Sequence, residues 1–288
     1  MLKNNLQPTY KRQRFLLTFI RQLRNGVTST ELQKLVFLYT MQENTDFYEF
    51  IPYKFGSYSF QLAEDVDILC RDGFLSIEGS RIQSIGNYQI EVSLPIAVER
   101  GNSLIRKTYR EYPYYAINSE ITNRLFRSEE AEQLSRVREQ YKHTNKVLFT
   151  IGYEGKSVET FMNTLIQNDV RLLCDVRRNP LSRKFGFSKG KLKHIAETIG
   201  IKYIQIPDLG IESDKRKSLD TVEDYQYLFR EYEKNLQNII PQLEYLYSLL
   251  NSNVRIALMC FENEPEMCHR HIIRDYLINT YAIRSIDL

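Results

Sequence analysis

The sequence contains no tryptophan, and only four of its 288 residues are cysteine. The four cysteines do not follow a tight repeated spacing, which excludes a disulfide-stapled small domain and favours reduced thiols. No apolar run approaches the ~20 residues of a membrane-spanning helix. The polar, basic first residues do not resemble a cleavable leader. We therefore expect a cytoplasmic protein with no membrane partner.

A strong charge of either sign is also missing. The chain has 39 basic and 36 acidic residues, a net charge of +3, and neither half is a basic tail. Any contact with nucleic acid must therefore come from a local patch. Neither a Walker A loop nor a Gly-x-Gly-x-x-Gly turn is present, which disfavours ATP hydrolysis and dinucleotide chemistry. We expect no cofactor.

Length and composition indicate two globular domains. Hydrophobic residues make up 42% and charged residues 26% of a chain long enough for about two domains of ~150 residues. The character of the sequence changes between 101 and 145, a polar stretch that we interpret as a helical or polar linker. We place one domain at 1–100 and the other at 146–288.

The first domain has the order of a winged helix-turn-helix, an α+β fold. Apolar spacing predicts a helix over 11–24, a second beginning at Ser29, and a third that ends near Gly73. Two alternating runs, 74–78 and 88–92, then predict a hairpin.

The segment 53–75 also resembles winged-helix domains in which an aromatic-Gly-x-Tyr-Ser turn starts the recognition helix. The alternative is a small helical interaction module without a nucleic-acid role. The acidic residues Glu64, Asp65 and Asp67 on the presumed recognition helix favour that alternative, because phosphates repel them.

The second domain alternates strands with helices. Continuous apolar strands separated by helices predict a parallel sheet covered on both faces, a three-layer α/β domain. The predicted strands are 146–152, 171–176, 202–206 and 254–260, and the predicted helices are 157–168, 191–199, 225–250 and 264–278.

Polar clusters follow three of these strands directly. They are 153–156, 175–183 and 260–270. Because the carboxyl ends of parallel strands meet at one edge, we expect the three clusters to form one cleft. Its candidate acids or bases are Glu154, Asp175 and Glu262.

The stretch 177–193 holds seven basic residues and no acidic one. With Phe185 and Phe187 among them, it is typical of a surface that binds phosphates and stacks bases. The alternative is a solvated loop whose phenylalanines fill the core. The candidate substrate or phosphate contacts are Tyr153, Arg177, Arg178, Arg183, Lys184, Lys189, Lys191, His269 and Arg270.

Cys268 is the candidate nucleophile. Asn263 and Glu266 form a capping-box pattern, so we expect a helix to begin just ahead of Cys268. A thiol at a helix N-terminus beside an arginine has its thiolate favoured. The alternative is that Cys268 packs inward while Arg270 pairs with Glu262 or Asp175.

A metal site is the alternative to a nucleophilic Cys268. Cys260, Cys268, His269 and His271 could serve as ligands, but their spacing matches none of the usual zinc patterns. Adjacent residues of a helix also point apart. We therefore expect no metal.

The second domain resembles a known family, the domain of unknown function family 488, over about 146–288. The resemblance rests on Thr-Ile-Gly-Tyr-Glu-Gly at 150–155, Asp-Val-Arg-x-x-Pro-x-Ser-Arg at 175–183, Gly-Ile-x-Tyr with Leu-Gly at 200–210, and Cys-x-Glu-x5-Cys-His-Arg at 260–270. It implies a compact α/β domain with a polar edge that acts on nucleic acids or nucleotides, and it supplies no reaction. Tyr153-Glu154 replaces a His-Ser pair common in the family, and a second glycine after Gly210 is missing.

The leading functional hypothesis is an enzyme that processes nucleic acid or nucleotides, a hydrolase or group transferase with a phosphate-binding basic edge. The first domain would position it. The alternative is a non-catalytic nucleic-acid-binding regulator, or a defence or repair accessory protein, that senses an anionic ligand.

Overall fold

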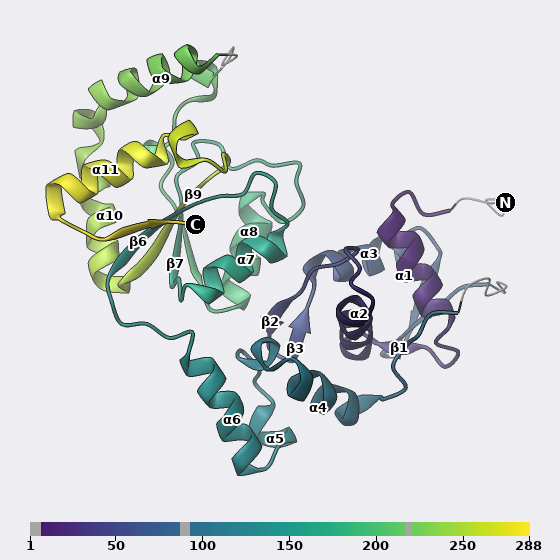
Figure 1. Ribbon diagram of the computed structural model, residues 1–288. Coiled ribbons are helices and arrows are strands. Elements are labelled where there is room, and N and C mark those ends of the chain that lie inside the picture. Colours follow the sequence, from purple (N-terminus) through teal and green to yellow (C-terminus); the bar gives the residue numbers. More distant parts are fainter. Residues whose placement is uncertain (1–6, 87–92, 217–220) are drawn as a thin grey trace. The chain divides into compact units, whose positions relative to one another are not determined.

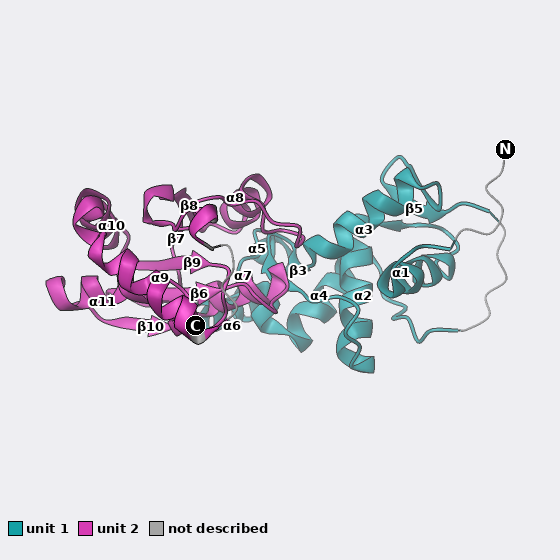
Figure 2. Cartoon of the chain, turned by 90° about the horizontal axis from the view of Figure 1, so that it is seen from above, with its two compact units in different colours: residues 1–140 teal, residues 141–288 magenta. Residues whose placement is uncertain are grey.

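The computed structural model describes residues 7–86, 93–216 and 221–288 (Figure 1). The chain divides into two compact units, 1–140 and 141–288 (Figure 2). None of the described helices is long and apolar enough to cross a membrane.

Three helices of the first unit surround an apolar core, as their periodicity predicts. They are α1 (Lys11–Arg21), α2 (Ser29–Glu43) and α3 (Phe60–Arg71). The N-cap of α2 is Thr28 and not the expected Ser29, because the Thr28 hydroxyl accepts from the backbone N–H of Glu31 at 3.3 Å.

The hairpin of the first unit is shorter than predicted. It pairs β4 (Leu75–Glu78) with β5 (Arg81–Ser84), and β1 (Val27–Thr28) completes a sheet of order β1-β5-β4. Gly79 takes a positive φ of 62° in the tight turn, so the second strand follows at once. The predicted strand 88–92 lies outside the described residues, and the winged-helix assignment stays a prediction.

A second, small hairpin was not expected from the sequence. It joins β2 (Ile51–Tyr53) to β3 (Gly56–Tyr58) where a turn was predicted. Four further helical segments complete the first unit: α4 (Gly101–Glu111), the 3-10 turn η1 (Pro113–Ala116), α5 (Thr122–Leu125) and α6 (Ser128–Glu139).

One acidic residue of α3 faces the core and not solvent. Asp65 is fully buried and accepts hydrogen bonds from Arg12 at 2.7 Å, Gln13 at 2.9 Å and Tyr48 at 3.0 Å. Asp65 therefore cannot repel a phosphate at the helix surface, as its position in the sequence had suggested.

The second unit is a three-layer α/β domain around five parallel strands, as predicted. The sheet has the order β10-β6-β9-β7-β8. Its strands are β6 (Val147–Gly152), β7 (Leu172–Asp175), β8 (Lys202–Gln205), β9 (Arg255–Cys260) and β10 (Ser285–Asp287). The strand β10 was not predicted, because it has only three residues and begins soon after α11 ends at Tyr281.

Helices cover both faces of this sheet (Figure 1). The first face carries α7 (Val158–Gln167) and α8 (Lys189–Thr198), and the other carries α10 (Ile240–Asn253) and α11 (Arg270–Tyr281). The single predicted helix 225–250 is instead α9 (Val222–Lys234) and α10, separated by the 3-10 turn η4 (Leu236–Ile239). Pro241 in the first turn of α10 explains the break, since proline cannot continue a helix ladder.

Candidate functional site

The three polar clusters follow strands that are neighbours in the sheet. β9 lies between β6 and β7, with Gly152 paired to Cys260 and Asp175 to Met259. The loop after β9 passes so close to the end of β6 that a Cβ on Gly152 would lie 1.8 Å from the carbonyl oxygen of Glu262. The segments therefore meet at one edge, as the sequence predicted.

At the centre of this edge Asp175 and Arg177 neutralise each other. Arg177 donates from Nε to Oδ1 of Asp175 at 2.8 Å and from Nη2 to Oδ2 at 2.6 Å. Its Nη1 donates to the Tyr153 hydroxyl at 3.1 Å and to the carbonyl of Phe187 at 2.9 Å. The Tyr203 hydroxyl also donates to Asp175 at 2.7 Å, and burial together with that carboxylate raises the pKa of Tyr203.

This pairing differs from the roles expected from the sequence. Asp175 is fully buried and the Arg177 side chain is 6% exposed. Both groups already have partners in this structure, so their expected roles, an acid or base for Asp175 and a phosphate contact for Arg177, stay predictions. They act as a brace between β7 and Tyr153.

Arg270 holds the loop after β9 in place through hydrogen bonds. The guanidinium is fully buried and donates to the backbone carbonyls of Glu262 and, at 2.6 Å, Asn263, and to the Thr150 hydroxyl at 3.3 Å. The sequence suggested an ion pair with Glu262 or Asp175. The structure shows two carbonyls and a hydroxyl as its partners instead, so Arg270 positions the loop, and its role as a ligand contact stays a prediction.

Of the four candidate acids and nucleophiles, Glu154 is the exposed one. Its Oε2 accepts from the backbone N–H of Asn263 at 3.1 Å. Glu262 is only 7% exposed.

Two lysines also hold this edge together. Lys184 donates to the carbonyl of Tyr153 at 3.1 Å, and Lys156 donates to that of Gly152 at 3.0 Å. Desolvation lowers the pKa of both, and the nearby Arg270 guanidinium lowers that of Lys156 further. Lys184 was expected to bind phosphate, but its ammonium is engaged with backbone.

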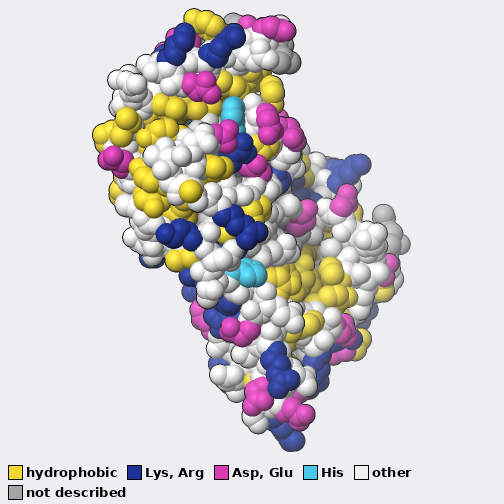
Figure 3. Space-filling view, turned by 60° about the vertical axis from the view of Figure 1, so that its left-hand side comes forward, with side chains coloured by type: hydrophobic (Ala, Val, Ile, Leu, Met, Phe, Trp, Pro, Cys, Tyr) yellow, Lys and Arg dark blue, Asp and Glu magenta, His cyan; other side chains and the backbone are white. Residues whose placement is uncertain are grey.

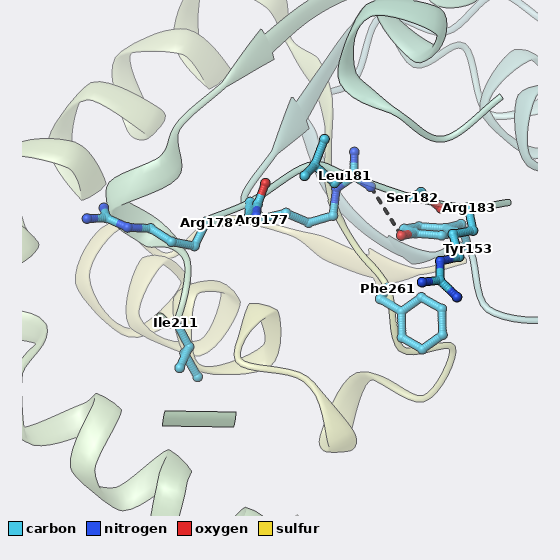
Figure 4. A pocket seen from close by; sticks show the side chains of 9 residues that line it. Tyr153, Arg177, Arg178, Leu181, Ser182, Arg183, Ile211 and Phe261 are labelled. Atoms are coloured by element: carbon cyan, nitrogen blue, oxygen red, sulfur yellow. Dashed lines mark hydrogen bonds between the residues drawn. The ribbon is translucent and has the colours of Figure 1, made fainter. Parts of the chain in front are cut away.

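A pocket of about 400 Å³ opens above the brace (Figure 4). Figure 4 shows Arg178 and Arg183 on either side of the Arg177–Tyr153 hydrogen bond. The lining residues are Tyr153, Arg177, Arg178, Asn179, Leu181, Ser182, Arg183, Ile211 and Phe261. Sequence reasoning missed Phe261 and Ile211, since neither has a pattern of its own. Phe261 is nevertheless a large aromatic residue directly after a buried strand, and its ring is 43% exposed.

The two arginines of the pocket differ in their partners. Arg178 donates to Asp208 at 2.8 Å and lies 3.9 Å from Glu212. Arg183 is exposed, and within the described ranges no residue forms a hydrogen bond or ion pair with it. Arg183 is thus the cation of the pocket that a ligand reaches without breaking a contact.

The rest of the basic stretch is divided between core and surface. Phe187 is fully buried and stacks on Tyr153 with ring centroids 4.3 Å apart, so it fills the core, as the alternative interpretation held. Lys189 and Lys191 are exposed on α8 and do not line the pocket. On the face seen in Figure 3, basic side chains are scattered among acidic and apolar ones.

Cys268 lies in an environment opposite to the expected one. Its backbone is extended (φ −138°, ψ 136°), and α11 begins only at Arg270. The thiol is 1% exposed, and burial raises its pKa. The helix N-terminus therefore does not activate it. It lies instead in a buried cluster with Cys260 and His269, whose ligand-type atoms are all within 4.8 Å of one another.

Comparison with known proteins identifies the second unit alone. Residues 157–277 match the family model described as Domain of unknown function DUF488. No curated protein and no solved structure matches the chain. The matched residues run from the start of α7 into α11 and include both the Asp-Val-Arg and the Cys-His-Arg elements. Most of the second unit, residues 157–277, therefore matches the DUF488 family.

Proposed function

We propose that the second unit binds a phosphate-bearing ligand, a nucleotide or a segment of nucleic acid, in the pocket above the Asp175–Arg177 brace. The observation that carries this proposal is Arg183, a cation that has no hydrogen-bond or ion-pair partner among the residues that the structure describes and that lies beside the exposed ring of Phe261. A guanidinium suits phosphate oxygens, and an aromatic ring suits a base. A volume of about 400 Å³ is within the range of small-molecule sites.

Further donors surround the same space. Asn179 and Ser182 line the pocket, and Arg178 reaches it while paired with Asp208. Exposed ion pairs of this kind contribute little free energy, about 0–1 kcal/mol, so a phosphate can compete for Arg178 at low cost.

The geometry favours binding over catalysis. Three of the four candidate catalytic groups, Asp175, Glu262 and Cys268, are buried. The enzyme hypothesis, a hydrolase or group transferase, therefore rests on Glu154, whose exposed carboxylate lies at the same edge. A nucleic-acid-binding regulator that senses an anionic ligand needs none of these groups.

The proposal is tested by fluorescence anisotropy with a labelled mononucleotide and a labelled single-stranded oligonucleotide. Arg183→Gln should weaken the binding of both probes at least ~10-fold and reduce the salt slope for the oligonucleotide by about 0.7 for the lost phosphate contact. Lys193→Gln, on α8 and paired with Glu197, is the matched control and should bind as wild type. Equal binding by Arg183→Gln and wild type would overturn the proposal.

A double variant separates the two ligand classes. Lys189→Gln with Lys191→Gln removes two exposed cations outside the pocket. If the ligand is a polymer that extends over α8, the variant loses oligonucleotide affinity and keeps mononucleotide affinity. If the ligand is a free nucleotide, it binds both probes as wild type.

A further inference from the structure

We propose that Cys260, Cys268 and His269 form a binding site for a thiophilic metal ion, with Zn²⁺ as the best fit. The three residues lie at the end of β9 and directly ahead of α11, and all are fully or almost fully buried. They are distinct from the residues that line the pocket.

The spacing of the donor atoms suits tetrahedral zinc. The Cys268 Sγ lies 3.8 Å from His269 Nδ1. The Sγ atoms of Cys260 and Cys268 and one ring nitrogen of His269 all lie within 4.8 Å of one another. Zinc–sulfur bonds of about 2.3 Å and zinc–nitrogen bonds of about 2.0 Å place two ligands of a tetrahedral site about 3.6 Å apart. Small side-chain rotations would bring the three donors onto one ion.

The imidazole is oriented as metal-binding histidines are. The Nε2 of His269 lies 3.3 Å from the carbonyl oxygen of Val176. If Nε2 carries the proton and donates it to that carbonyl, Nδ1 keeps its lone pair, and this nitrogen faces the thiol. A backbone carbonyl on the second ring nitrogen is a common outer partner of zinc-bound histidine.

The backbone ahead of α11 allows the two adjacent residues Cys268 and His269 to face one ion. Adjacent residues point apart within a helix, but Cys268 is extended and lies before α11. Its side chain and that of His269 therefore converge.

Charge balance favours a divalent ion in this buried place. Two thiolates and a neutral imidazole carry two negative charges, which Zn²⁺ cancels. Because thiol ligands bind metal as thiolates, binding would release their protons. Three protein donors leave one coordination position for a non-protein ligand.

Titration of the reduced, chelator-treated full chain with Co²⁺ tests the proposal. We expect one equivalent to produce the near-ultraviolet band of cobalt–thiolate bonds, and Zn²⁺ to remove it. Cys268→Ser and His269→Gln should weaken Co²⁺ binding at least ~100-fold, more than the loss of an outer partner does. Cys174→Ser is the matched control, because Cys174 is equally buried on the same face of the sheet.

Circular dichroism of each apo variant separates lost binding from lost folding. If Cys268→Ser does not fold, Zn²⁺ must still raise the thermal unfolding midpoint of the wild-type protein. The proposal is overturned if the folded wild-type protein shows no thiolate band, or if Cys268→Ser and His269→Gln keep wild-type affinity.

Discussion

Arg177 and Asp175, two residues apart at the end of β7, form a buried bidentate ion pair with N–O distances of 2.6 and 2.8 Å. The pair also holds Tyr153, so it links the ends of β7 and β6. The most recognisable motif of the site thus joins two strand ends at the pocket, and Arg177 is also one of the residues that line it.

Breaking this pair should destabilise the second unit. Removal of one partner leaves an uncompensated buried charge, so Arg177→Met or Asp175→Asn should lower the free energy of unfolding by about 3–5 kcal/mol. The double variant should lose less than the sum of the two single variants, because it leaves neither charge alone. Urea denaturation measures all three. Losses below ~1 kcal/mol would show that the pair is not a brace.

Gly152→Ala should disturb the edge of the sheet, because the added Cβ would lie 1.8 Å from the carbonyl oxygen of Glu262. Overpacking against backbone typically costs about 1–3 kcal/mol, and we expect a loss at or above the upper end. Gly190→Ala, within α8 and with open space around its Cβ, is the control. Thermal denaturation should show the control unchanged or up to ~1 kcal/mol more stable. Similar stability of the two variants would contradict the close approach.

The stability of the first unit should rise with pH through Lys34. This lysine is 1% exposed, donates to the carbonyl of Ser57 at 2.6 Å, and has its pKa lowered by burial to about 7. At pH 7 the unfolded chain holds about half a proton more than the folded chain, and this difference approaches one proton by pH 9, so stability increases with pH by up to about 1.4 kcal/mol per unit.

Lys34→Met should remove this pH dependence and increase stability at pH 7. Urea denaturation of both proteins at pH 7, 8 and 9 gives the difference directly. A difference that stays constant with pH would mean that Lys34 keeps its ordinary pKa in the folded protein.

Cysteine labelling should follow exposure and not the helix-start pattern. Cys70 is half-buried on α3, whereas Cys174, Cys260 and Cys268 are buried. Peptide mapping after brief iodoacetamide treatment at neutral pH should find Cys70 alkylated first, ahead of the candidate nucleophile Cys268. Labelling of Cys268 ahead of Cys70 would show that this thiol is activated and accessible.

The parallel sheet could be predicted because strands buried on both faces have an unmistakable apolar pattern, and β6 and β9 are buried at every position. The meeting of three loops at one edge followed from that topology. Partners within the edge could not be predicted, since a sequence does not show whether Arg177 faces solvent or Asp175. The backbone of Cys268 was mispredicted because a capping pattern at 263–266 leads here into a short 3-10 turn and not into α11.

Nuclear magnetic resonance of the ¹⁵N-labelled full chain, titrated with a mononucleotide, tests the ligand site most directly. If the pocket binds the mononucleotide, the amide signals of Asn179, Ser182, Arg183 and Phe261 should shift together in one saturable transition. The signals of α8 beyond its first turn should stay in place. The same titration of Arg183→Gln should move none of them at equal ligand concentration. Shifts confined to the first unit, or the absence of any shift at the pocket, would contradict the proposed ligand site.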